Sequence, residues 1–156
     1  MAFVAASLLA PRIQERVGLR VLILGYAANA AGTLVLLGCA LAFGSGLSGW
    51  IMAPALAVIG FGEGLGVSPL FGAVLARVPQ SDAGAASGVV ETTTQIGMSF
   101  GVTVLGLVFA VGLEAGAGPA DSTTAFTAAL VGTLVLAVAA LALALAVLRG
   151  RREPTG

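Results

Sequence analysis

Four long stretches of the sequence are almost free of charge, and this pattern decides the class of protein. A helix that crosses the hydrocarbon core of a bilayer needs about 20 mainly apolar residues, and each stretch is longer than that. Charged residues make up only 9% of the chain, against about 25% in soluble domains. The sequence therefore predicts an all-α integral membrane protein, a polytopic bundle with four full transmembrane helices. The predicted spans are residues 21–43, 50–76, 84–113 and 123–148.

A shorter apolar run, residues 1–10, precedes the first span. As a helix it reaches only about 14 Å, less than half of the hydrocarbon core. It does not have the pattern of a signal peptide, because the basic residues follow it instead of preceding it. We expect a partial helix, the end of a longer one cut short by truncation. A short interfacial helix is the alternative.

All seven basic residues are arginines, and they lie in alternate connections between the spans. Residues 11–20 hold three, the connection after the second span holds Arg77, and residues 149–156 hold three. With four spans these segments share one side of the membrane, and arginine-rich segments mark the cytoplasmic side. We therefore expect a multi-pass protein of the cell (inner) membrane, with a cytoplasmic loop at residues 11–20 and a cytoplasmic C-terminal tail.

The spans differ in polarity. Residues 21–43 and 123–148 carry few groups that need a hydrogen-bond partner, so both suit contact with lipid. Residues 84–113 carry polar side chains at every fourth position, which places them on one face of a helix. Lipid cannot satisfy such groups, so this face should meet protein or water. The polar face comprises Ser87, Glu91, Gln95, Ser99 and Thr103.

The stretch GFGEGLGVSP, residues 60–69, lies near the middle of the second span. It has neither the GxGxxG spacing of a dinucleotide loop nor the GK[ST] of a phosphate loop. Glycines four apart let helices approach closely, and a proline removes a backbone hydrogen bond, so such a helix can bend where it lines a cavity. The candidates for helix packing or bending are Gly60, Gly62, Gly64, Gly66, Pro69, Gly84, Gly88, Gly97 and Gly101.

Several segments together resemble the major facilitator superfamily. Residues 60–109 combine a GxGxGxGxxP helix, a VP-x-x-x-AGxASG loop and a helix with a T-x-x-Q-x-G rhythm. Upstream, PRIQERVGLR is similar to that superfamily's P-x-x-x-R-x-G-x-R loop, and RGRRE follows the last span. The order and spacing resemble the drug:proton antiporter branch with fourteen helices (EmrB/QacA-like).

This resemblance implies the C-terminal part of a proton-coupled efflux protein for drug-like or amphipathic compounds. It implies that residues 21–43 and 123–148 lie outermost and that residues 50–76 help to line a central cavity. The implied partners are the lipid bilayer, a small-molecule substrate, protons and the missing N-terminal helices. Members often carry other residues where Glu63 and Glu91 stand, so the resemblance assigns neither glutamate a role.

The residues themselves make Glu63, Glu91 and Gln95 the candidates for proton or substrate contact. An ionised carboxylate in the middle of a membrane is costly, and such groups are often functional. The alternative for Glu63 is a neutral acid bonded to a backbone carbonyl freed by the glycines or Pro69. The alternative for Glu91 is a solvated acid near a helix start, and Gln95 lies one turn deeper.

Other classes of function lack the residues that they need. The chain has one cysteine, no histidine and a formal net charge of zero. We therefore predict no enzyme, no metal or other cofactor and no nucleic-acid partner. The alternative to a transporter part is a non-transporting membrane fragment, or a subunit that assembles with a separate N-terminal half. We expect no transport by this chain alone.

Overall fold

The structure is a computed structural model that describes residues 1–114 and 119–150. Its long elements are all helices, and four of them are long and apolar enough to cross a membrane. This confirms the predicted all-α membrane class. The helices are α1 Ala2–Val17, α2 Arg20–Phe43, α3 Gly49–Leu75, α4 Ala83–Glu114 and α5 Pro119–Gly150, with single 3₁₀ turns at Gly44–Gly46 and Gln80–Asp82.

The first helix is longer than expected. Residues 11–17, which the sequence analysis assigns to a loop, continue α1 through Pro11. The helix ends at Gly18, whose φ of 61° is a conformation that glycine adopts easily. The Gly18 N–H donates to the Gln14 carbonyl oxygen at 2.7 Å and closes the last turn. The predicted loop is therefore reduced to the few residues before α2.

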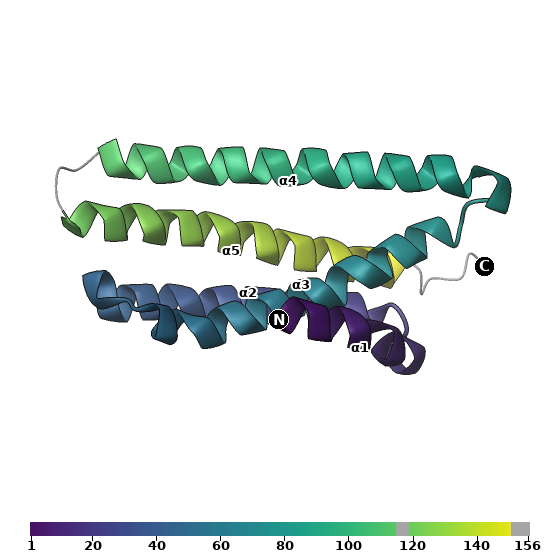
Figure 1. Cartoon of the computed structure of the whole chain (residues 1–156), viewed down its shortest axis with the longest axis horizontal. Coiled ribbons are helices and arrows are strands. Elements are labelled where there is room, and N and C mark those ends of the chain that lie inside the picture. The colour runs from purple at the N-terminus through teal and green to yellow at the C-terminus, as the bar shows by residue number, and fades with distance from the viewer. Residues whose placement is uncertain (115–118, 151–156) are drawn as a thin grey trace.

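The helices form a layered bundle in which α4 is the outermost element (Figure 1). Helix α4 packs mainly on α5, α5 packs on α2, α2 packs on α3, and α3 carries α1 on a further face. Helix α2 therefore contacts α1, α3 and α5 and keeps one exposed face, which carries Leu34 and Leu41. The expectation that residues 21–43 suit lipid is wrong for the face of α2 that carries Gly25, Gly32 and Leu36, which are buried.

The glycines of α3 explain how closely α2 and α3 pack. A Cβ atom added to Gly62 would lie 2.6 Å from the Asn29 amide nitrogen and 2.6 Å from the Gly25 carbonyl oxygen. A Cβ on Gly25 would lie 2.8 Å from the Gly66 amide nitrogen. These separations are too short for any side chain, so the two backbones meet directly. Small residues at helix contacts are how membrane helices gain van der Waals packing.

A second face of α3 meets α1 in the same way. A Cβ on Gly64 would lie 2.5 Å from the Phe3 carbonyl oxygen and 2.7 Å from the Ala6 Cβ. Ala6 and Leu65 belong to the buried cluster between these helices. The glycines of residues 60–69 thus serve two helix contacts at once, and α3 continues as one helix through the whole stretch.

We predict that Gly62→Ala lowers the free energy of unfolding by about 1–3 kcal/mol, because the new methyl group overpacks the α2–α3 contact. The matched control is Gly72→Ala in the same helix, where an added Cβ meets nothing within 4 Å. That change should leave stability equal or raise it by up to about 1 kcal/mol, since alanine is the better helix former. Unfolding in detergent micelles followed by circular dichroism measures both. Equal stability of the two variants would contradict the packing.

Candidate functional site

Glu63 projects from α3 between its two glycine contacts, about 100° around the helix from both Gly62 and Gly64. Its side chain is exposed and lines a hollow of about 250 Å³ between α2, α3 and α5. Tyr26 and Asn29 of α2 and Thr133 of α5 line the same space, which we call the Glu63 hollow. Its other lining residues are glycines, alanines, Val67 and Leu136. The hollow therefore combines a carboxyl, an amide and hydroxyls within the apolar length of the helices.

The described residues give the Glu63 carboxyl no hydrogen bond and no ion pair. Among the described residues, no hydrogen bond from Glu63 to a backbone carbonyl supports the alternative of a neutral, bonded acid. Thr133 does not compete for the carboxyl, because its Oγ1 donates to the Ala129 carbonyl oxygen at 2.9 Å. The carboxyl is thus available to a proton, water or a polar group of a bound molecule.

Glu91 and Gln95 lie together on α4. The Gln95 Nε2 donates to the Glu91 Oε1 at 2.8 Å, one helical turn away. Hydroxyls on the same helix bond their own backbone, as Ser87 does to the Ala83 carbonyl oxygen at 2.8 Å. Each residue of the predicted polar face, from Ser87 to Thr103, is exposed. Among the described residues, no helix covers this face of α4.

The candidate glycines of α3 lie against neighbouring helices, whereas those of α4 do not. An added Cβ on Gly60 would touch Phe3 at 3.7 Å, and one on Gly66 would touch Tyr26 at 3.9 Å. Within the described chain nothing lies within 4 Å of a Cβ added to the glycines of α4 that the sequence analysis selects. Their role in helix packing stays a prediction. These glycines are Gly84, Gly88, Gly97 and Gly101.

The structure does not bring the two glutamates into one pocket. The Glu63 hollow is lined by α2, α3 and α5 only. Helix α4, which carries Glu91 and Gln95, has few contacts with α3. The chain therefore presents two separate polar surfaces, one in the hollow and one along α4.

The other polar residues of the Glu63 hollow were not selected as candidates from the sequence. Tyr26 and Asn29 are three residues apart, a spacing that puts both side chains on one face of α2. That spacing could have marked Tyr26 and Asn29 as site candidates in the sequence. Nothing in the sequence marks Thr133, because a single threonine in an apolar helix ordinarily bonds its own backbone.

Comparison with known proteins gives two relatives, both named for transport. The chain is 40% identical over 110 residues to the cephamycin export protein CmcT of Amycolatopsis lactamdurans, covering 69% of this chain and 22% of that protein. It is 44% identical over 64 residues to the probable actinorhodin transporter of Streptomyces coelicolor, covering 41% of this chain and 11% of that protein. The matched part is thus about a fifth or less of each relative.

No family model matches the sequence, and no solved structure matches it. The helices and the relatives together define the class: a multi-pass membrane protein similar to transport and export proteins. Both relatives carry names that denote transport or export.

We predict that the polar face of α4 meets water or protein and not lipid. In a Cys39→Ala background, a cysteine at Gln95 should react several-fold faster with a membrane-impermeant maleimide than one at Phe100. Phe100 is 70% exposed and lies about 140° around the same helix. Chain reconstituted in liposomes is the sample. Faster labelling at Phe100 would mean that the polar face is turned to lipid.

Proposed function

We propose that this chain is the C-terminal part of a proton-coupled exporter of the major facilitator type, in the fourteen-helix antiporter branch, for antibiotic-type or amphipathic compounds. The observation that carries the proposal is the 40% identity with an export protein over 69% of the chain. The bare Glu63 carboxyl in a hollow among membrane helices supports it. Such an acid is costly in a membrane, and acids found there are often functional.

The proposed orientation places the C-terminus in the cytoplasm. Helices α1, α3 and α5 run in the same direction (Figure 1), and Gly60 and Gly64 of α3 meet Phe3 and Ala6 of α1 in turn. The described arginines then lie at one end of the bundle, at the ends of α1, α3 and α5 and the start of α2. These are Arg12, Arg16, Arg20, Arg77 and Arg149. Arginine at that end favours the cytoplasmic side.

In this proposal Glu63 exchanges a proton as the hollow alternates between dry and wet states. A lone charge in an apolar medium is costly, and carboxyls kept among membrane helices often serve as proton-exchanging groups. Alternating access of two halves around a midplane site would link these states to opposite sides of the membrane. Tyr26 and Asn29 offer hydrogen bonds to either form of the acid.

The polar face of α4 would form a wall of the transport pathway opposite helices that precede this chain in the longer protein. We propose that these helices also contact the α4 glycines. Without them the pathway is open along its length, so the chain alone should not transport. The second candidate is a non-transporting fragment, or a subunit that assembles with a separate N-terminal half. The uncovered α4 face favours assembly over an inert fragment.

We predict that Glu63→Gln in the longer protein abolishes the loss of the proton gradient that substrate causes in everted vesicles. Glutamine keeps the size of the side chain and removes the titrating proton, whereas the matched variant Glu63→Asp should retain measurable flux. A pH-sensitive dye reports the gradient. Proton coupling through Glu63 is wrong if Glu63→Gln transports with unchanged pH dependence.

We also predict that the chain alone, reconstituted in liposomes, shows no substrate counterflow above protein-free liposomes. Co-reconstitution with the preceding helices as a separate polypeptide should restore it. Counterflow by the chain alone would contradict the proposed division of the pathway. A complete lack of restoration, with both parts folded and bound to each other, would favour the non-transporting alternative.

A further inference from the structure

A second and larger hollow lies at the arginine-rich end of the bundle. It has a volume of about 520 Å³ and is formed by the start of α2, the end of α3 and the end of α5. We call it the Arg77 pocket. Tyr26 and Ala140 line both this pocket and the Glu63 hollow, so the two spaces adjoin. The Arg77 pocket is not needed for the proposed proton step.

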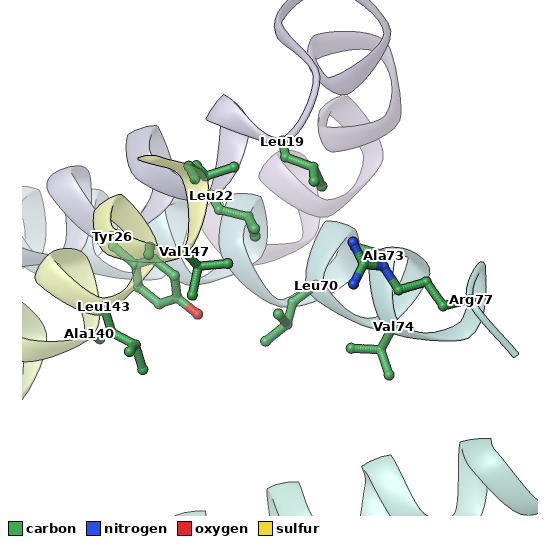
Figure 2. Close-up of a pocket in the computed structure, with 12 residues that line it drawn as sticks. Leu19, Leu22, Tyr26, Leu70, Ala73, Val74, Arg77, Ala140, Leu143 and Val147 are labelled. Carbon is green, nitrogen blue, oxygen red and sulfur yellow. The ribbon is translucent and has the colours of Figure 1, made fainter. Parts of the chain in front are cut away.

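The walls of the Arg77 pocket are almost wholly apolar. Leucine, valine and alanine side chains from all three helices line it, among them Leu22, Leu70 and Val147 (Figure 2). Along α5 the lining runs from Ala140 to Leu148, which is about 12 Å of helix. An elongated apolar space of this kind suits a hydrocarbon chain lying along the helices.

Arg77 is the one charged residue among those that line the Arg77 pocket. Arg77 follows α3 directly, is exposed, and makes no ion pair with a described residue. Figure 2 shows its side chain turned back along α3. No aspartate or glutamate is among the lining residues of the pocket. A guanidinium in such a position can bind a phosphate through two parallel hydrogen bonds.

We propose that the Arg77 pocket binds an anionic phospholipid, with the phosphate at Arg77 and an acyl chain along α3 and α5. Charge complementarity decides the occupant, because the described residues of this end carry five arginines against two acids, Glu15 and Asp82. Basic pockets between membrane helices on the cytoplasmic side are sites where anionic head groups bind. Tyr26, which lines both spaces, lies where the Arg77 pocket adjoins the Glu63 hollow.

Native mass spectrometry of the chain tests this proposal. The chain, solubilised in neutral detergent, is mixed with equal amounts of phosphatidylglycerol and phosphatidylcholine that carry the same acyl chains. We expect a preference of about fivefold for phosphatidylglycerol, the ratio given by about 1 kcal/mol per arginine near anionic lipid. Arg77→Gln should reduce the preference to about one. The matched control is Arg12→Gln, which removes an arginine of the same end on α1.

A second variant tests the apolar part of the pocket. Ala144→Trp fills the space between α3 and α5 without changing charge, and it should release the bound lipid. Circular dichroism verifies that each variant keeps its helices. Equal retention of the two lipids by the unmodified chain would overturn the proposal. So would an Arg12→Gln effect as large as that of Arg77→Gln, or a lipid-free dimer. The readout is lipid retention, so it does not depend on transport.

Discussion

The direct backbone contact of α3 with two neighbouring helices is the constraint on which the rest of the structure depends. Gly62 and Gly66 meet α2, whereas Gly60 and Gly64 meet α1. Glu63 lies about 100° around the helix from both Gly62 and Gly64. With two faces of α3 closed by backbone contact, the carboxyl is left on the face that looks toward α5. The same glycines therefore set the packing of three helices and the direction of the one acid in α3.

The sequence predicts the number of long helices and their approximate extents, because charge and hydropathy depend on the helix itself. It does not predict which apolar surfaces pack together. Helix α2 has few polar groups, and polarity alone therefore indicated lipid contact. Its buried Gly25 and Gly32 are the residues that reveal a packed face. The extension of α1 past Pro11 was missed because three arginines and a proline suggested a loop, although residues 12–17 form helix readily.

In the candidate site, too, the sequence predicts a single residue but not the neighbours that surround it. Glu63 was selected from the sequence because an ionised carboxylate in the middle of a membrane is costly, and its place in a long apolar span can be read from the sequence alone. Its neighbours Tyr26, Asn29 and Thr133 come from two other helices, and no spacing in the sequence places them beside it. Thr133 in particular is 70 positions away along the chain, so only the fold brings it there.

The two sides of the bundle differ in packing and polarity. Small residues close the α1–α3–α2 side, while the α3–α5 side keeps two adjoining hollows and α4 keeps an uncovered polar face. A membrane protein with polar groups of this kind requires further protein or water next to them. This requirement agrees with the greater length of the relatives, of which the matched part is 22% and 11%. Export, in this account, belongs to the assembled protein.

Cysteine cross-linking tests the central claim, that α3 turns Glu63 toward α5 while its glycines pack on α1 and α2. In a Cys39→Ala background, the chain with Glu63→Cys and Thr133→Cys is treated in liposomes with a bifunctional thiol reagent long enough to span the Glu63 hollow. We expect efficient cross-linking of this α3–α5 pair and little cross-linking of Glu63→Cys with Leu8→Cys on α1, where Leu8 is 72% exposed. Cross-linking of the α1 pair in preference to the α5 pair would contradict it.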